Sequence, residues 1–242
     1  MTKFGIFLIN KPKGITSHDV VDYLRKVTGE KTIGHAGTLD PLASGLMIVA
    51  IGREFTRKIS DFSKLDKEYT AEATLGSTST TYDAEGVIAR HPELGSGSLA
   101  QIPDQVRNDG IEKPSQEEVN ETINGFVGEQ MQMPPIYSAK KIKGKKAYDL
   151  ARHGKSVELK PVSVNVYEIK LLDYQYPLLK FSAKVSSGTY IRSLVNDIGQ
   201  KLGTGAYMSD LVRISIGDYR LLEAIDLYQI KSPADLVNAK IS

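Results

Sequence analysis

One aspartate in this sequence stands where a carboxylate could react. The stretch GHAGTLDPLASGLMIVAIG, residues 34–52, places Asp40 between a glycine-rich approach and a long apolar run. Gly34, Ala36 and Gly37 are small enough to let a ligand come close to the backbone, and a carboxylate there can act as a nucleophile or a base. A structural interpretation stands beside this one. Asp is a preferred helix N-cap and Pro a preferred first helical residue, so LDPLASG could be a capped short helix that also holds the carboxylate in place.

Three further side chains could work with this carboxylate. Tyr69 lies on the apolar face of the alternating stretch KEYTAEATLG, where the alternative is an ordinary core tyrosine. Tyr190 and Arg192 follow the SSG turn that leads into a helical pattern. An arginine in the first turn of a helix opposes the helix dipole by about 0.3–1 kcal/mol. A carboxylate or phosphate partner would explain Arg192 better, and a solvated arginine at a loop edge is the alternative.

Positive charge gathers in one stretch of the chain. The whole chain has 31 Lys and Arg against 29 Asp and Glu, a net charge of +2 that predicts no particular partner. Residues 137–160, however, contain eight basic and two acidic side chains, a local excess of six positive charges. Such a stretch is either a solubilising surface loop or an arm that binds phosphates, and the density of lysines favours nucleic acid.

Several kinds of chemistry are excluded by what the sequence lacks. The chain has no cysteine, which rules out disulfides, thiolate metal sites and cysteine nucleophiles. It has no P-loop, no G-x-G-x-x-G and no G-x-S-x-G, and its four histidines lack metal-ligand spacing. No apolar run approaches the roughly 18 residues of a membrane span, and the N-terminus is too short in its apolar part for a signal peptide. We therefore expect a cytoplasmic protein without a metal or cofactor.

The elements that must position these residues alternate without regular βαβ spacing. Short apolar runs predict strands in FGIFLIN and LMIVAIG, and apolar alternation predicts strands in KEYTAEATLG, VSVNVYEIKLLDY and LLKFSAKVSS. Helices are expected after Ser17 as N-cap, after Ser115 with Glu118 completing a capping box, and in TYIRSLVNDIGQKLG. Residues 91–113 are rich in Gly, Ser, Pro and Asp and predict a loop insertion. The pattern predicts an α+β fold around a mixed, mainly antiparallel sheet flanked by helices.

Five ordered motifs resemble the TruB family of tRNA pseudouridine synthases. They are INKPKGITSHDVV, GHAGTLDPLASGLMIVAIG, KEYTAEATLGSTSTTYDAEG, MPPIYSAKKIKGKKAYDLARHG and SSGTYIRSLVNDIGQKLGTGAYMSDLVR, and they cover nearly the whole chain outside residues 91–113. The resemblance implies the pseudouridine synthase fold as a single catalytic domain over residues 1–242. Many bacterial members carry a small C-terminal RNA-binding domain of the PUA type, and we expect none here.

The resemblance also implies a reaction. The family isomerises uridine 55 in the T-loop of tRNA to pseudouridine, by cutting the base from its ribose, rotating it and rejoining it through carbon 5. The aspartate attacks covalently at either ribose C1′ or uracil C6. The expected partner is tRNA, through its T-loop and T-stem, with no metal, no cofactor and no membrane, and the expected protein is a monomer.

Roles for individual residues follow from their positions in the motifs. The resemblance implies that Asp40 is the catalytic aspartate, that Arg192 pairs with it and that Tyr69 stacks on the flipped uracil and handles the C5 proton. It places His35 against the RNA and Tyr190 beside the ion pair, with Leu211 as an apolar wall of the pocket. Lys11 and Pro12 would brace the loop of the aspartate. The basic thumb at about residues 134–160 would clasp RNA through Lys143, Lys145 and Lys146.

Two departures and two alternatives accompany this interpretation. The family usually has two adjacent basic residues after the leucine, but here Val212 precedes a single Arg213, which affects one phosphate or core contact. GREFTR also replaces the more usual Gly-x-Ala-Thr-Lys. The first alternative function is a tRNA-binding folding chaperone that does not depend on catalysis. An aspartate-dependent hydrolase is the second, and it requires a water-positioning partner that the sequence does not reveal.

Overall fold

The chain folds into two compact units. The computed structural model describes residues 4–90, 113–135, 141–142, 145–146 and 159–241. Unit 1 contains residues 1–70, 184–187 and 210–242, and unit 2 contains residues 71–183 and 188–209. The expected insertion lies outside the described residues except for Lys113, and so does most of the expected thumb. The prediction of a single catalytic domain stays a prediction.

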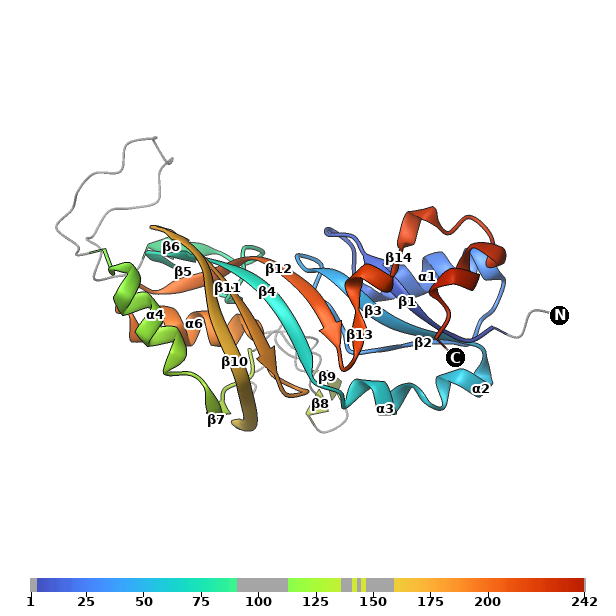
Figure 1. Ribbon diagram of the computed structural model, residues 1–242, viewed down its shortest axis with the longest axis horizontal. Coiled ribbons are helices and arrows are strands. Elements are labelled where there is room, and N and C mark those ends of the chain that lie inside the picture. The colour runs from blue at the N-terminus through green and yellow to red at the C-terminus, as the bar shows by residue number, and fades with distance from the viewer. Residues whose placement is uncertain (1–3, 91–112, 136–140, 143–144, 147–158, 242) are drawn as a thin grey trace. The chain divides into compact units, whose positions relative to one another are not determined.

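Figure 1 labels the elements. Those of unit 1 are β1 (Ile6–Lys11), α1 (Ser17–Thr28), β2 (Ile33–Ala36), β3 (Ser44–Ile51), α2 (Arg53–Thr56), α3 (Ile59–Ser63), β13 (Tyr219–Arg220), η2 (Leu221–Glu223), β14 (Ile225–Asp226), η3 (Leu227–Gln229) and η4 (Pro233–Ala239). Those of unit 2 are β5 (Ser77–Ser79), β6 (Ile88–Arg90), α4 (Gln116–Asn124), β7 (Gly128–Gln132), β8 (Lys141–Ile142), β9 (Lys145–Lys146), β10 (Val162–Gln175) and α6 (Ile191–Lys201). Three strands have residues in both units: β4 (Lys67–Leu75), β11 (Leu178–Val185) and β12 (Ala206–Ile216).

The sheet of unit 1 is built around β3. This strand is the continuous apolar run that follows Asp40, and seven of its eight residues are buried, as expected for a strand covered on both faces. The strand order is β14-β1-β3-β12, with β1 antiparallel to β3 and β12 parallel to it. β2 also pairs with β3, antiparallel and over residues 48–51, so β2 and β3 form a hairpin.

Short helices flank this sheet. One cluster of buried residues from β1, β2 and β3 packs against Phe55, Ile59 and Phe62 of the α2–α3 segment. α1 begins one residue earlier than expected, because its N-cap is Thr16 and Ser17 is the first helical residue. The Thr16 side chain accepts from the Asp19 N–H, and the Asp19 carboxylate accepts from the Thr16 N–H. This reciprocal capping box does not use the Ser17 hydroxyl, which instead forms hydrogen bonds with Leu39.

Unit 2 has strands and helices of its own. Its strands follow the order β4-β11-β10-β7, with β7 antiparallel to β10. Along β4 the residues alternate strictly between buried and partly exposed, as the sequence pattern predicted. α4 packs against β10 and α6, and its expected capping box is present, with Ser115 as N-cap and Glu118 as its partner.

The predicted fold class is confirmed. Strands and short helices are interspersed, the described strand pairs are mainly antiparallel, and two parallel pairs join β1 to β14 and β12 to β3. Within the described ranges no helix is both long and apolar enough to cross a membrane.

Candidate functional site

Asp40 lies in the loop of the β2–β3 hairpin, residues 37–43. The Ala43 N–H donates to the Asp40 carbonyl at 3.1 Å, which closes a turn rather than a helix. The prediction of a capped short helix at this position was therefore wrong. The physical reason is that the chain must reverse here, since β2 and β3 run antiparallel as direct neighbours. Pro41 and Leu42 occupy the turn, and β3 begins at Ser44.

Several hydrogen bonds hold this loop to the start of the chain. The Ser17 hydroxyl donates to the Leu39 carbonyl at 3.0 Å and accepts from the Leu39 N–H at 2.8 Å, in a buried position. The Gly14 N–H donates to the Pro41 carbonyl at 2.8 Å. The residues on both sides of Asp40 are thus bound to the start of α1 and to the segment that joins it to β1, which limits where the carboxylate can move.

Lys11 supports that segment in turn. It is fully buried, and its ammonium donates to the Pro12 carbonyl at 3.0 Å and the Ile15 carbonyl at 2.6 Å. The Pro12–Ile15 turn contains Gly14, which binds Pro41. The expected bracing role of Lys11 and Pro12 is consistent with this chain of contacts and stays a prediction as a role in function.

Two more buried cations lie beside Gly37. Arg213 is 1% exposed, and its guanidinium donates from Nε to the Leu46 carbonyl at 2.7 Å and from Nη2 to the Gly37 carbonyl at 3.1 Å. Lys67 is 6% exposed, and a Cβ added at Gly37 would lie 3.5 Å from Arg213 Nη1 and 3.9 Å from Lys67 Cε. Both distances are ordinary van der Waals contacts, so it is the φ of +82° rather than the space around it that favours glycine at residue 37.

Lys67 joins three segments of unit 1. Its ammonium donates to the Ser63 carbonyl at 2.7 Å, the Leu65 carbonyl at 2.5 Å and the Ser187 hydroxyl at 3.2 Å. Burial and then the positive charge of Arg213 lower the pKa of Lys67, and with the opposing effect of Asp66 the value is about 8. Burying a charged lysine costs free energy, so packing alone does not explain why a lysine is found at this position.

His35 is held neutral on the same hairpin. Burial and then the charge of Arg213 lower its pKa, and an interaction with the Gly37 backbone opposes them. Its buried Nδ1 atom has no partner with hydrogen-bond geometry among the described residues. A neutral imidazole can stack on a base or exchange hydrogen bonds with it, whereas it cannot form an ion pair with a phosphate.

Tyr69 and Leu211 are both buried in strands of unit 1. Tyr69 lies two residues after Lys67 on the same face of β4 and is 8% exposed. Leu211 is 5% exposed in β12, two residues before Arg213, and its N–H donates to the Asp210 carboxylate at 2.9 Å. Tyr69 and Leu211 therefore each lie two residues along a strand from a buried cation, Lys67 in β4 and Arg213 in β12.

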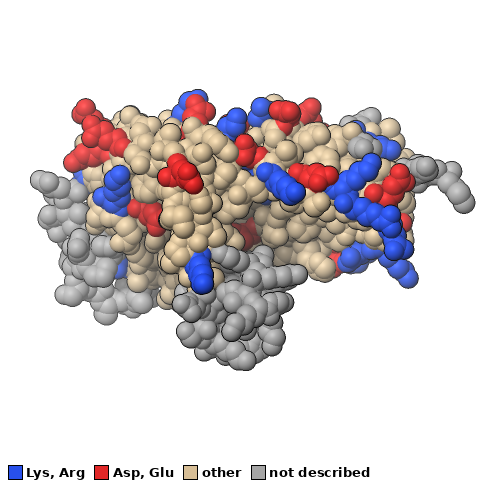
Figure 2. Space-filling model, turned by 90° about the horizontal axis from the view of Figure 1, so that it is seen from below, with Lys and Arg blue, Asp and Glu red and all other residues tan. Residues whose placement is uncertain are grey.

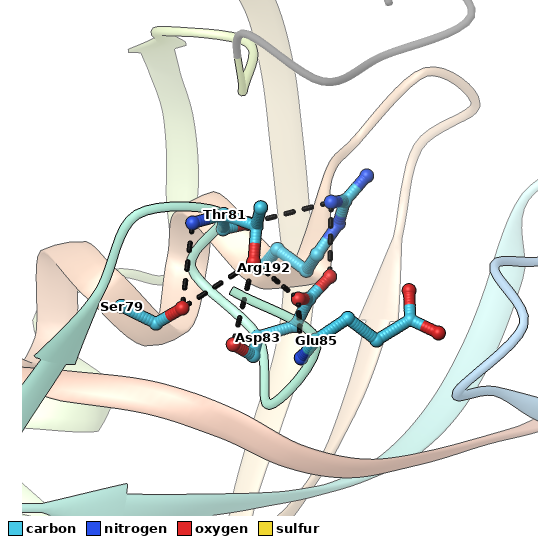
Figure 3. A network of polar contacts seen from close by, with 5 residues as sticks. All are labelled: Ser79, Thr81, Asp83, Glu85 and Arg192. Carbon is cyan, nitrogen blue, oxygen red and sulfur yellow. Dashed lines mark hydrogen bonds and ion pairs between the residues drawn. The ribbon is translucent and has the colours of Figure 1, made fainter. Parts of the chain in front are cut away.

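Unit 2 contains a buried ion pair that the sequence analysis missed. Arg192, in the first turn of α6, donates from Nη1 to the Asp83 carboxylate at 3.0 Å, with side-chain exposures of 8% and 1%. It also donates to the Thr81 carbonyl at 3.3 Å. Figure 3 shows Ser79, Thr81 and Glu85 around the same carboxylate, which accepts from the Thr81 hydroxyl and from the Glu85 N–H.

The turn that carries Asp83 is itself constrained. Tyr82 has φ +63°, a left-handed conformation that is uncommon for a bulky residue. The Met208 N–H donates to the Tyr82 carbonyl at 2.9 Å, and the Ala84 N–H donates to the Met208 carbonyl at 3.0 Å. Asp83 is thus held from both sides by β12. Backbone strain at a fixed position is often associated with functional sites.

The expected carboxylate partner of Arg192 exists, and it is Asp83 in the described contacts. The predicted pairing of Arg192 with Asp40 stays a prediction, since Asp40 belongs to unit 1 and Arg192 to unit 2.

Tyr190 is the N-cap residue of α6. Its N–H donates to the Gln132 side-chain oxygen at 2.8 Å, and its carbonyl accepts from Gln132 Nε2 at 3.1 Å. This amide replaces a side-chain cap and fixes the start of the helix.

Basic residues occur in two further segments of the chain. Lys145 and Lys146 lie in β9, which pairs with β8, and Lys143 lies outside the described residues. The α2–α3 segment adds four exposed basic residues against two exposed acidic ones, Glu54 and Asp61; the basic ones are Arg53, Arg57, Lys58 and Lys64. Figure 2 views the side on which α2 and α3 lie and shows Lys and Arg gathered toward its right-hand end.

Comparison with known families places the chain in a class of RNA-modifying enzymes. Residues 25–191 match the TruB family pseudouridylate synthase N-terminal domain, and residues 192–239 match the tRNA pseudouridylate synthase B C-terminal domain. The chain therefore belongs to the TruB family of pseudouridylate synthases, and the predicted family is confirmed.

Individual relatives agree with this assignment. The chain is 44% identical to tRNA pseudouridine synthase B of Protochlamydia amoebophila over 96% of its own length and 81% of the relative's. It is 42% identical to the protein of the same name from Caldanaerobacter subterraneus, over 96% and 75% of the two chains.

Two solved structures share the fold. One is a Cbf5-Nop10-Gar1 complex (28% identity, TM-score 0.65), of which the match covers 93% of this chain and 53% of that one. The other is an H/ACA RNP bound to a substrate RNA containing 2′-deoxyuridine (26% identity, TM-score 0.63), with 93% and 51% covered. This chain thus spans about half the length of those solved chains.

Proposed function

We propose that this chain isomerises uridine 55 in the T-loop of tRNA to pseudouridine. The observation that carries the proposal is Asp40, which lies in a hairpin loop fixed on both sides of the carboxylate, in a chain of the TruB family. Its curated relatives are named for this activity on tRNA. The reaction breaks the bond between N1 and C1′ and forms one between C5 and C1′. C5 loses a proton and N1 gains one, so the product is an isomer of uridine and no second substrate is needed.

The described residues divide the work as follows. Asp40 attacks the nucleoside after the uridine has flipped out of its stack, which costs a few kcal/mol. Tyr69 stacks on the extracted uracil and handles the C5 proton, while Leu211 forms an apolar wall beside it. Arg192, held by Asp83, keeps the reactive carboxylate ionised. The catalysis requires no metal or cofactor.

RNA binding in this proposal uses His35 and the basic segments. A neutral His35 contacts bases rather than phosphates. Lys143, Lys145 and Lys146 of the thumb contact phosphates of the T-stem. The exposed basic residues of the α2–α3 segment are further candidates for contacts with phosphates. The enzyme acts as a cytoplasmic monomer.

Tritium release tests the function directly. A T-loop stem-loop RNA with 5-tritiated uridine should release tritium with the wild-type protein and not with Asp40→Asn. Asp218→Asn, which changes an exposed aspartate in the same unit, serves as the control and should behave as wild type. Filter binding should give nearly equal RNA affinities for all three proteins, since base flipping and phosphate contacts do not need the nucleophile.

Two results would contradict the proposal. Equal loss of release and of RNA affinity in Asp40→Asn would make Asp40 structural. Absence of release from both the stem-loop and whole tRNA, with tight binding kept, would favour the chaperone interpretation.

A further inference from the structure

Arg213 lies where two strands, β2 and β12, pair with different parts of β3. β2 pairs with residues 48–51 of β3, whereas β12 pairs with β3 at Ser44 and Gly45. Between these two partners β3 presents Leu46, whose carbonyl accepts from Arg213 Nε at 2.7 Å. The same guanidinium donates to Gly37, the first residue after β2, at 3.1 Å. One side chain therefore ties together the two ends of the segment that contains Asp40.

The side chain makes these contacts from inside the protein. Arg213 is 1% exposed, and its backbone approaches β3 so closely that a Cβ at Gly45 would lie 2.4 Å from the Arg213 carbonyl oxygen. Burial of this degree leaves no room for a phosphate of the RNA. The contact of Arg213 is therefore a core contact, and its effect on the reaction has to pass through the loop.

Packing alone does not account for an arginine in this position. The buried charged side chains among the described residues of unit 1 are three cations, Lys11, Lys67 and Arg213, and none is a carboxylate. Each of the three donates to two backbone carbonyls. Buried charges cost stability that an apolar side chain of similar volume would not. What the cations add is directed hydrogen bonding to backbone carbonyls, including those of loop residues such as Ile15 and Gly37.

We propose that Arg213 is a positioning residue for the isomerisation: it holds the Gly37 and Leu46 ends of the Asp40 loop in one register, so that the carboxylate is presented in one orientation. The inference rests on the proposed function, because it concerns the same reaction. A displacement of a reacting group by about 1 Å can cost roughly a hundredfold in rate. A clamp on both ends of the loop is thus expected to affect the rate of the chemical step more than the binding of RNA.

Arg213→Lys is the first test. Lysine keeps the positive charge but lacks the planar fork that serves two carbonyls in different directions. Single-turnover tritium release with saturating enzyme should slow about ten- to hundredfold, while the dissociation constant for the RNA stays within about threefold of wild type. Arg220→Lys is the matched control, because Arg220 is an exposed arginine of unit 1 that pairs with Glu68, and it should keep the wild-type rate.

Gly37→Ala provides a second test if Arg213→Lys does not fold. It keeps every charge, but an alanine at φ +82° is strained and places its Cβ 3.5 Å from Arg213 Nη1. Gly29→Ala is its control, since Gly29 has φ +71° with open space around it. Urea denaturation verifies that each variant is folded at the assay temperature. The proposal expects slow release with RNA affinity kept in Gly37→Ala and not in Gly29→Ala.

The outcomes separate the inference from the function it rests on. A folded Arg213→Lys or Gly37→Ala variant with wild-type single-turnover rate would overturn the positioning role. A rate loss matched by an equal loss of RNA affinity would overturn it as well. Failure of the wild-type protein to release tritium would instead overturn the proposed function.

Discussion

Buried charged residues in the described part of the chain are held in two different ways. Buried cations in unit 1 donate to carbonyls, and the buried cation of unit 2, Arg192, meets a carboxylate. The difference matters for mutation. A backbone carbonyl remains in place when the side chain of its own residue is substituted. The carboxylate of Asp83, by contrast, can be removed by a single substitution.

At the residue scale, Asp83→Asn should destabilise the protein substantially. The change keeps the size of the side chain but removes the negative charge beside a guanidinium that is 8% exposed. Removing one partner of a buried ion pair typically costs about 3–5 kcal/mol. Urea denaturation of the whole chain should show a loss near that range, together with slower tritium release if Arg192 aims the nucleophile.

Glu72→Gln is the control for this change. Glu72 pairs with Lys180 at 3.4 Å on the surface of unit 2, with side-chain exposures of 36% and 44%. Surface pairs contribute at most about 1 kcal/mol, so this variant should unfold close to wild type. If Asp83→Asn were no more destabilising than Glu72→Gln, the buried pair would not be a stabilising element of unit 2.

At the scale of elements, periodic segments could be predicted and their partners could not. The alternation of β4, the apolar run of β3 and the capping box of α4 are local patterns, and the structure has all three. Asp83 and Arg192 are 109 residues apart, so no local pattern connects them. The same holds for Arg213 and Gly37, at a separation of 176 residues. Asp40 could be selected because its motif is local, whereas the side chains that hold its loop depend on how β3 and β12 pair.

At Asp40 the residue preferences favour a helix, whereas the structure has a turn. Asp-Pro is a good helix start by residue preference. Here the chain has only seven residues, 37–43, in which to connect two antiparallel neighbours. Sheet pairing therefore decided the local conformation, and the preference for a helix was overridden.

Gly45→Ala tests how closely β3 and β12 must approach. Gly45 has φ +107°, and a Cβ there would lie 2.4 Å from the Arg213 carbonyl oxygen and 2.7 Å from its nitrogen. Since both are backbone atoms, the strands would have to separate. We expect a loss of several kcal/mol in the free energy of unfolding, which is the range of strongly destabilising core substitutions, and slower tritium release, because Arg213 would move with β12.

Gly14→Ala is the control for Gly45→Ala, because it separates the cost of a left-handed alanine from the cost of a steric clash. Gly14 has φ +89°, but nothing lies within 4 Å of an added Cβ. Its alanine variant therefore reports the cost of a left-handed alanine alone, about 1–2 kcal/mol. Equal unfolding free energies for the two variants would mean that β3 and β12 can separate without cost.

At the scale of the whole molecule, a net charge of +2 conceals a strongly uneven distribution. Binding of tRNA by this protein should therefore depend on where charge is removed rather than on how much. Replacing Lys143, Lys145 and Lys146 together by Gln should weaken binding of whole tRNA. The slope of log affinity against log salt concentration should flatten by about one for each lysine that contacts a phosphate.

A control variant with the same change in net charge makes this a test of location. Lys170, Lys180 and Lys201 lie in unit 2, two of them beside carboxylates and one over the Phe126 ring. Their triple Gln variant should keep the wild-type salt slope, since these ammonium groups already have partners. Titrations of tRNA at several salt concentrations compare the two triple variants directly. If both lower the slope equally, tRNA responds to the overall charge of the protein, and the thumb has no special role in binding.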